Sequence, residues 1–242
     1  MSDHEPISMA DACNVLEREG WLATRPADFR EAFLAAGRLR TFAAGEQIST
    51  AGDGADVGPG VYGVVAGQVA ALPAFGAPDA PTAVLYNPGH WTGYAPLFGG
   101  PRVIHVRAIT PATILSISFS EARRMLNARP EWWQNLALLV FETSVANGIV
   151  LTDLLLSRSD RRLAAMLLHH AGCRHAGQAH PIHLSQEDVG ATARLSRHPT
   201  RQLLQAFEAR GWISQSYRCI HILAPEQLRT LVDSGEPHGP SS

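Results

Sequence analysis

Short strands joined by tight turns are predicted between residues 42 and 119. Residues 42–100 hold 12 of the 21 glycines, and residues 59–111 hold 8 of the 16 prolines. Between these turn-forming residues lie runs of strand length that are rich in β-branched side chains: Val61–Val65, Gln68–Leu72, Ala83–Tyr86, Val103–Ala108 and Ala112–Phe119. The pattern predicts a β-barrel or β-roll.

Helices are predicted on both sides of this region. Ala10–Gly20 and Pro26–Gly37 carry apolar residues at helical spacing. Residues 112–171 contain a single proline, Pro130, and a single glycine, Gly148. The stretch from residue 131 to about 157 therefore predicts one continuous helix, roughly 40 Å long at about 1.5 Å per residue. Pro130 stands where a proline favours the start of a helix.

The long predicted helix has an apolar seam. Its members recur in alternating steps of three and four residues, as in a coiled coil: Leu136, Val140, Thr143, Asn147, Val150 and Leu154. The seam packs either on the chain's own roll or on a second copy. Further apolar residues lie on other faces of the helix, which favours a homodimer.

A helix-turn-helix is predicted over residues 184–213, which read LSQEDVGATARLSRHPTRQLLQAFEARGWI. Ser185 and Asp188 have the spacing of a capping box, ahead of a first helix with Val189 and Ala193 on its buried face. Ser196 is the predicted N-cap of a second helix, whose core face holds Leu203, Leu204 and Phe207.

The second of these helices keeps polar side chains on its outer face near its N-terminus, where this motif enters the major groove: Arg197, His198, Arg201 and Gln202. After Gly211, Trp212–Ser214 and Cys219–Leu223 predict two short strands that form a wing. The alternative interpretation of the whole segment is an ordinary helical hairpin with a solvated basic face.

Charge is divided unevenly along the chain, although the formal net charge is only −2. Residues 1–157 hold 10 arginines and 15 acidic residues, a balance of −5, whereas residues 158–242 hold 10 arginines and 7 acidic residues, a balance of +3. Because basic side chains favour phosphate binding, the second part is the one expected to bind nucleic acid.

Other classes of protein find little support. Cys13, Cys173 and Cys219 lie far apart and form no CxxC pair, which argues against a disulfide framework and against a cysteine-ligated metal. The longest uninterrupted apolar run, Leu136–Phe141, is far below the roughly 18 residues of a membrane span. A cytoplasmic protein without a membrane partner is expected.

The chain resembles the CRP/FNR family of bacterial transcription regulators over about residues 30–232. The residues that carry the resemblance are the helix-turn-helix just described and three stretches of the predicted roll: Phe42–Ile48 followed by Gly52-Asp53, Tyr62–Val69, and Val106–Thr110 followed by Leu115–Ile117. The resemblance implies a sensory β-roll, a long dimerising helix and a DNA-binding domain.

Members of this family that bind cyclic nucleotides have a Gly-Glu pair and an Arg-Ser or Arg-Thr pair in the phosphate-binding cassette. Here Tyr94 follows Gly93, and Val103 follows Arg102. Tyrosine removes the acceptor for the ribose hydroxyl, and valine donates nothing to phosphate, so an effector other than cyclic AMP is expected. The effector-pocket candidates are Tyr62, Trp91, Gly93, Tyr94, Arg102, Val103 and Asn147.

Other sensing chemistries of the family lack their residues. An iron-sulfur cluster needs four thiolates, and Cys13 is alone in its region. Haem ligation would fall to His90 or His105. A regulator without any effector, controlled by its own abundance, is a further alternative. No cofactor or metal is expected.

The resemblance also indicates how DNA would be read. At positions where the family commonly shows Arg, Glu and Arg stand Arg197, His198 and Gln202, and Arg194 occupies a turn where glycine is frequent. Arginine suits guanine and glutamine suits adenine. The DNA-binding candidates are Ser185, Arg194, Ser196, Arg197, His198, Thr200, Arg201 and Gln202.

The predicted architecture is α+β. A sensory roll with N-terminal helices spans residues 1–129, a dimerisation helix residues 130–157, and a winged helix-turn-helix residues 158–242. The predicted function is a homodimeric transcription regulator that binds an inverted-repeat operator in double-stranded DNA and contacts RNA polymerase, and that is not an enzyme. The alternative is a cupin-like metal-binding enzyme, which requires a histidine and carboxylate cluster.

Overall fold

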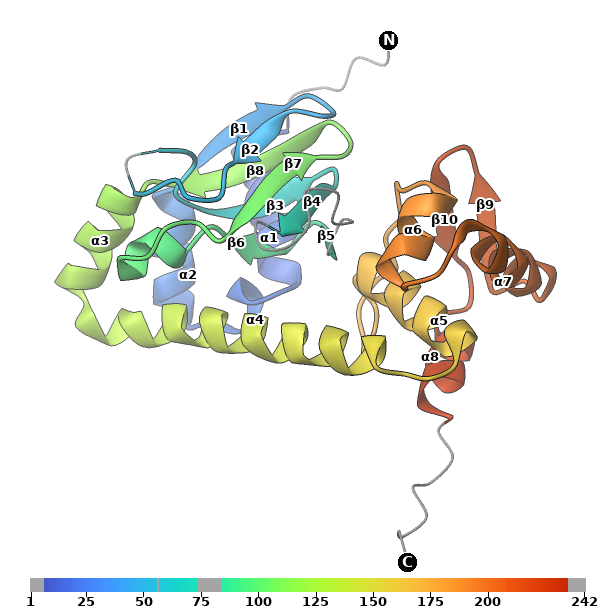
Figure 1. The fold of residues 1–242 in the computed structure, drawn as a ribbon. Coiled ribbons are helices and arrows are strands. Elements are labelled where there is room, and N and C mark those ends of the chain that lie inside the picture. The colour runs from blue at the N-terminus through green and yellow to red at the C-terminus, as the bar shows by residue number, and fades with distance from the viewer. Residues whose placement is uncertain (1–6, 56, 74–83, 235–242) are drawn as a thin grey trace, which may run out of the picture. The chain divides into compact units, whose positions relative to one another are not determined.

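The computed structural model describes residues 7–55, 57–73 and 84–234. The chain divides into two compact units, Met1–Ala146 and Asn147–Ser242 (Figure 1). The division falls inside helix α4, Trp133–Leu154, so this helix contributes residues to both units. The predicted domain limits at residues 129 and 157 stay predictions.

The first unit is built on a β-roll of two antiparallel sheets within the described residues. One sheet has the order β1-β8-β3-β6, with strands Arg38–Phe42, Ala112–Ile117, Val61–Ala66 and Trp91–Thr92. The other has the order β2-β7-β4-β5, with strands Gln47–Ser49, Ile104–Ala108, Val69–Pro73 and Val84–Tyr86. The predicted roll is confirmed, although part of one predicted strand, Ala83, lies outside the described residues.

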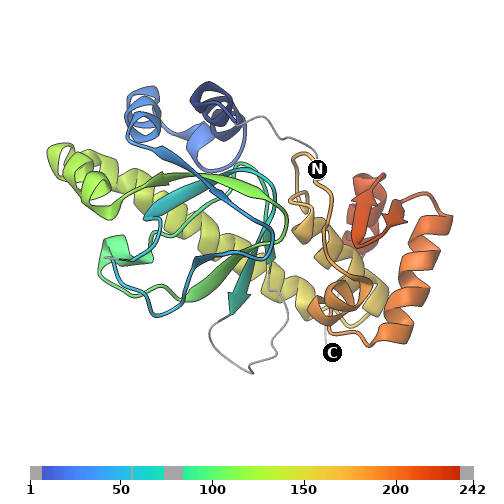
Figure 2. The ribbon, with the colours of Figure 1, turned by 90° about the horizontal axis from the view of Figure 1, so that it is seen from above.

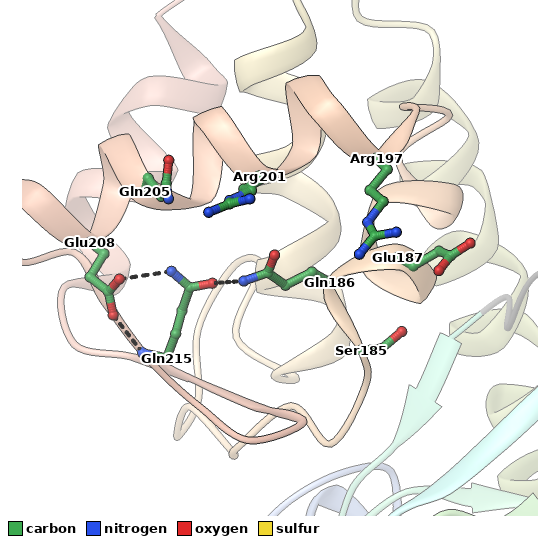
Figure 3. Close-up of a pocket in the computed structure, with 8 residues that line it drawn as sticks. All are labelled: Ser185, Gln186, Glu187, Arg197, Arg201, Gln205, Glu208 and Gln215. Carbon is green, nitrogen blue, oxygen red and sulfur yellow. Dashed lines mark hydrogen bonds between the residues drawn. The ribbon is translucent and has the colours of Figure 1, made fainter.

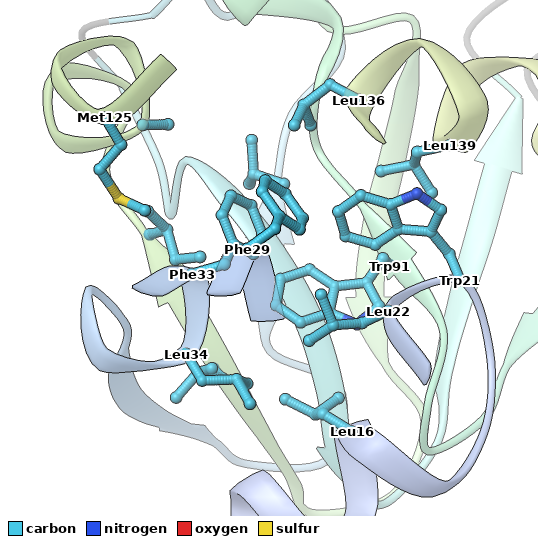
Figure 4. Packing of buried hydrophobic residues seen from close by; sticks show 14 of the residues in the cluster. Leu16, Trp21, Leu22, Phe29, Phe33, Leu34, Trp91, Met125, Leu136 and Leu139 are labelled. Carbon is cyan, nitrogen blue, oxygen red and sulfur yellow. The ribbon is translucent and has the colours of Figure 1, made fainter. Parts of the chain in front are cut away.

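Helices pack around the roll and enclose its main core (Figure 2). They are α1 (Met9–Arg18), α2 (Ala27–Ala35) and α3 (Phe119–Ala128), with the short 3-10 helices η1 (Leu22–Thr24), η2 (Ala95–Phe98) and η3 (Pro130–Trp132). The core between helices and roll is aromatic: Trp21 lies 5.6 Å from Trp91 and 5.8 Å from Phe29, ring centre to ring centre (Figure 4). Such edge-on contacts add to the hydrophobic burial.

The first turns of α4 also belong to this core. Leu136 is fully buried and Leu139 is 3% exposed, both against the roll and its helices. At Leu136 the seam thus packs on the chain's own roll, one of the two expected alternatives. The exposed large apolar residues of the helix lie outside the predicted seam: Phe141, Val145, Leu151 and Leu155 are 63%, 46%, 61% and 73% exposed.

In the described part of the second unit, the end of α4 is followed by three helices, a β-hairpin and a last helix. The helices after α4 are α5 (Ser159–His170), α6 (Gln186–Thr192), α7 (Arg197–Ala209) and α8 (Pro225–Asp233). The hairpin pairs β9 (Ile213–Ser216) with β10 (Cys219–Ile222), and Ile182 forms a bridge to Ile220 at its edge. The predicted wing is confirmed, with a tighter turn than the sequence indicated.

Charged contacts tie the last turn of α4 to the second unit. The Asp153 carboxylate is 5% exposed; it accepts hydrogen bonds from Arg174 Nε at 2.8 Å and lies 2.7 Å from His169 Nε2. Despite burial, these partners lower the pKa of Asp153 to about 2. Arg174 also reaches Asp233 of α8 at 2.9 Å.

Arg162 makes a second tie at the same end of α4. Its Nη1 donates to the carbonyls of Leu156 at 2.7 Å and Ser157 at 2.9 Å, while its Nε donates to the carbonyl of Ala193 at 3.2 Å. One side chain thus joins the loop after α4 to the turn that follows α6.

Candidate nucleic-acid interface

Helices α6 and α7 cross at a glycine. A Cβ on Gly190 would lie 2.2 Å from Oγ1 of Thr200, so only glycine permits this approach. Thr200 is 1% exposed and donates from Oγ1 to the carbonyl of Ser196 at 2.9 Å. The prediction that Thr200 contacts DNA is therefore at odds with the structure, since its side chain is used in packing the two helices.

The start of α6 follows the predicted capping pattern. Asp188 donates its backbone N–H to Ser185 Oγ at 3.1 Å, and the Asp188 carboxylate accepts from the backbone and side chain of Ser185. These reciprocal bonds complete a capping box. Ser196 is the N-cap residue of α7 as predicted, but its side chain makes no capping hydrogen bond.

The turn between the two helices contains a non-glycine residue in the left-handed region. Arg194 has a φ of 57°, a conformation that costs an L-residue about 1 kcal/mol or more. Its side chain is exposed and has no hydrogen bond or ion pair among the described residues. The sequence predicted a turn here. The turn forms between α6 and α7 even though an arginine takes the position where glycine is frequent.

The outer face of α7 carries the other predicted DNA contacts. Arg197, His198, Arg201 and Gln202 are all exposed, while Leu204 and Phe207 are buried beneath them. Within the part of the chain that the structure describes, these four side chains make no hydrogen bond or ion pair. We call Arg197, His198, Arg201 and Gln202 the reading surface.

A polar hollow of about 530 Å³ lies beside the reading surface (Figure 3). It is lined by Arg197, Arg201, Gln205 and Glu208 of α7, by Ser185 with Gln186 and Glu187 at the start of α6, and by Gln215 of β9. A concave, polar surface with two free arginines suits a phosphate-bearing partner.

Three residues in this hollow are hydrogen-bonded in a chain that sequence reasoning missed. Gln215 donates its backbone N–H to Glu208 Oε1 at 2.8 Å and its side-chain Nε2 to Oε2 at 2.9 Å. Gln186 Nε2 donates to Gln215 Oε1 at 2.8 Å. The residues are up to 29 positions apart, and no local pattern in the sequence marks them.

The first unit contains most of the predicted effector residues, and Arg102 is the most unusual of them. Its side chain is buried, with the residue 4% exposed, and burial lowers its pKa. Its guanidinium nitrogens lie 3.4 to 3.5 Å from the carbonyl oxygens of Gly93, Val57 and Gly60. Its Nε has no partner among the described residues.

The other predicted effector residues are not gathered around one cavity. Trp91 is 1% exposed and packs in the aromatic core, so the structure corrects its placement in a pocket. Tyr62 is fully buried, which raises the pKa of its hydroxyl to about 12, and this hydroxyl lies 3.4 Å from Ser49 Oγ. Val103 is exposed, and Asn147 is exposed on α4 in the second unit.

Gly93 and Tyr94 hold the turn beside Arg102. A Cβ on Gly93 would lie 2.5 Å from the carbonyl oxygen of Gly60, and its φ of 84° also favours glycine. Tyr94 packs against the aromatic core rather than pointing freely into solvent. Glycine is thus required here by close packing.

The histidines considered for haem have different environments. His90 stacks on Tyr86 with ring centres 3.8 Å apart, and burial lowers its pKa to about 4. His105 Nδ1 accepts a hydrogen bond from the backbone of Ala51 at 3.3 Å. In residues 7–55, 57–73 and 84–234, no three histidine, cysteine or acidic side chains come together as a metal site.

Comparison with known protein families identifies a domain within the second unit. Residues 161–231 match the Crp-like helix-turn-helix domain. No curated protein sequence matches the chain.

Solved structures resemble the chain over most of its length. FixK2 from Bradyrhizobium japonicum is 18% identical with a TM-score of 0.67, covering 83% of this chain and 99% of its own. A CRP/FNR-family transcriptional regulator from Thermus thermophilus is 22% identical with a TM-score of 0.60, covering 81% and 98%.

A third structure is similar to the same extent. The c-di-GMP responsive global regulator CLP from Xanthomonas campestris is 16% identical with a TM-score of 0.59, covering 81% of this chain and 99% of its own. Residues 161–231 thus form a Crp-like helix-turn-helix domain, and the chain has the fold of the CRP/FNR family of transcriptional regulators.

Proposed function

We propose that the protein is a homodimeric transcription regulator that binds an inverted-repeat operator in double-stranded DNA. The observation that carries the proposal is the reading surface: Arg197 and Arg201 stand exposed and unpaired on the first turns of the second helix of a helix-turn-helix. An arginine that pairs with an acidic neighbour has its donors occupied, whereas the donors of these two are free for phosphates or guanine edges.

The apolar side of α4 supports the homodimer. Phe141, Val145, Leu151 and Leu155 are exposed on it, and Phe141, Gly148 and Leu155 follow one another at intervals of seven residues, the repeat of a coiled coil. By length and composition, Pro130–Leu154 is also a candidate membrane span, and 17% of its most apolar 18-residue window is buried. We favour a second copy as its cover, because Glu142 of this helix pairs with Arg25 at 3.1 Å and Asp153 is held by Arg174.

A two-fold dimer presents two reading surfaces to two half-sites of opposite orientation. The protein would act in the cytoplasm, where DNA is accessible, and would contact RNA polymerase. Its effector would differ from cyclic AMP, because Tyr94 and Val103 lack the acceptor and the donor that a cyclic nucleotide needs. Such an effector acts only through a preference for one arrangement of the dimer.

Selection of bound sequences from random double-stranded DNA tests this function. We expect enrichment of an inverted repeat that contains a guanine in each half-site, bound by a species with twice the chain's mass of 26.1 kDa in sedimentation. Binding should weaken steeply with salt, as phosphate contacts require. Absence of an enriched repeat, together with binding that is insensitive to salt, would contradict the proposal.

A further inference from the structure

The chain of hydrogen bonds from Glu208 through Gln215 to Gln186 has a fixed direction (Figure 3). A carboxylate has no hydrogen to donate, so Glu208 accepts both of its bonds from Gln215. The side-chain NH₂ of Gln215 must therefore face Glu208, and its oxygen must face Gln186. Gln186 in turn directs its NH₂ towards Gln215, at 2.8 Å.

This direction determines what Gln186 offers to a partner. One N–H of its amide is used by Gln215, which leaves its oxygen as an acceptor and its second N–H as a donor. Gln186 lines the same hollow as Arg197 and Arg201, beside the reading surface. A phosphate has only acceptors and would leave the amide oxygen without a partner. A base edge with one donor and one acceptor satisfies both groups.

We propose that Gln186 reads an adenine, and that Glu208 sets the orientation of its amide through Gln215. The inference rests on the proposed function, and it adds a residue of the first helix to the reading surface. Adenine presents the N6 amino group as donor and N7 as acceptor in the major groove, the pair that a glutamine amide matches. Glu208 and Gln215 are positioning residues, since they act only through Gln186.

The substitution Glu208→Gln tests the orientation. The backbone N–H of Gln215 still requires an acceptor, so the oxygen of the introduced amide takes that place and its NH₂ replaces Oε2. Gln215 must then turn its oxygen towards this NH₂ and its own NH₂ towards Gln186. Gln186 reverses as well, directs its oxygen inwards and presents two N–H donors outwards, which fit the two acceptors of guanine.

The experiment compares the sequences selected by four proteins: the wild type, Glu208→Gln, Gln186→Ala and Glu187→Gln. We expect one position of each half-site to change from adenine to guanine with Glu208→Gln, by about tenfold or more in relative affinity. Gln186→Ala should remove the preference at that same position. Glu187→Gln makes the same change of charge in the same hollow, and should raise affinity for every sequence without changing the preferred base.

The outcomes separate this inference from the function on which it rests. If the wild type enriches an inverted repeat but Glu208→Gln keeps adenine or loses all preference at that position, the proposed orientation is wrong. The same conclusion follows if Gln186→Ala leaves every preference unchanged, or if Glu187→Gln produces the same switch. If the wild type enriches no repeat at all, it is the DNA-binding function that fails.

Discussion

The arginines of the two units lie in opposite environments. Arg197 and Arg201 are exposed on α7 with no partner among the described residues, whereas Arg102 is buried in the roll against three backbone carbonyls. An exposed arginine adds little to folding and keeps its charge for a ligand. A buried arginine satisfies carbonyl groups that would otherwise lose their hydrogen bonds. The same residue type is therefore expected to serve binding in one unit and stability in the other.

Arg174 provides an intermediate case in the second unit. It is mostly buried, like Arg102, but its partners are the carboxylates of Asp153 and Asp233. Carboxylates titrate in acid and carbonyls do not. The two buried arginines should therefore differ in how their environments respond to pH.

The largest effect is expected at the reading surface. Arg197→Ala should weaken binding of the selected operator by about a hundredfold, because a dimer loses one contact of about 1–3 kcal/mol in each half-site. Unfolding should be unchanged, since the side chain is exposed. Titration of labelled operator DNA measures the loss.

Arg210→Ala is the control for this substitution, because Arg210 is also exposed on the second unit but lies over the ring of Trp212, 5.0 Å from its centre. Equal losses from Arg197→Ala and Arg210→Ala would mean that general positive charge, and not the reading surface, governs binding.

Arg102→Met should act on stability instead. We expect a loss of about 2–3 kcal/mol in the unfolding free energy of the roll, because buried carbonyls lose their donor. Denaturant unfolding followed by tryptophan fluorescence reports on this unit, since it holds Trp21, Trp91, Trp132 and Trp133, four of the five tryptophans. DNA affinity of the folded variant should remain that of the wild type.

Arg107→Met is the matched control, since Arg107 is exposed on strand β7 of the same roll. If Arg102→Met proves as harmless as Arg107→Met, while operator binding changes, then Arg102 serves a ligand and the contrast between the units is lost.

The smallest expected effect is the loss of stability in acid that follows protonation of Asp153. Its pKa is lowered from 3.8 to about 2 in the folded state, so its contribution is complete above pH 3.8 and is lost as the pH falls towards 2. We expect this residue to contribute about 1–2 kcal/mol to the unfolding free energy after screening by solvent. Comparing the unfolding free energies of the wild type and Asp153→Asn at pH 5 and pH 2.5 isolates it.

Asp233→Asn serves as the comparison, because Asp233 contacts the same arginine but its side chain is 62% exposed. It should change stability by less than about 0.5 kcal/mol at either pH. An acid response that survives Asp153→Asn unchanged would show that other groups cause it.

Strong periodic and capping patterns in the sequence predicted the elements that carry function. The capping box at Ser185, the core positions Val189, Leu204 and Phe207, and the wing were all recognised, because each depends on residues close together in the sequence. Strands β1, β2 and β6 were missed. They are short and partly polar, and pairing with distant strands stabilises them more than local preference does.

The predictions that failed depend on contacts between distant residues. Thr200 has the polarity of a DNA contact, and only the approach of Gly190 shows that it is buried. Trp91 looked like a pocket residue until Trp21 and Phe33 were seen to surround it. Phe119 was placed at the end of a strand, but the N-cap at Ser118 makes it the first residue of α3.

The ties made by Asp153 and Arg162 limit where the chain can bend. The loop after α4 is hydrogen-bonded to α5, and through Arg162 it is linked to the turn of the helix-turn-helix. It is therefore not free to act as a hinge. Upstream in the same helix lies Gly148, where a Cβ would meet nothing and where glycine weakens a helix by about 1 kcal/mol. We therefore expect the last turn of α4 to keep its contacts with α5, and any bend of the helix to fall near Gly148 rather than at the helix end.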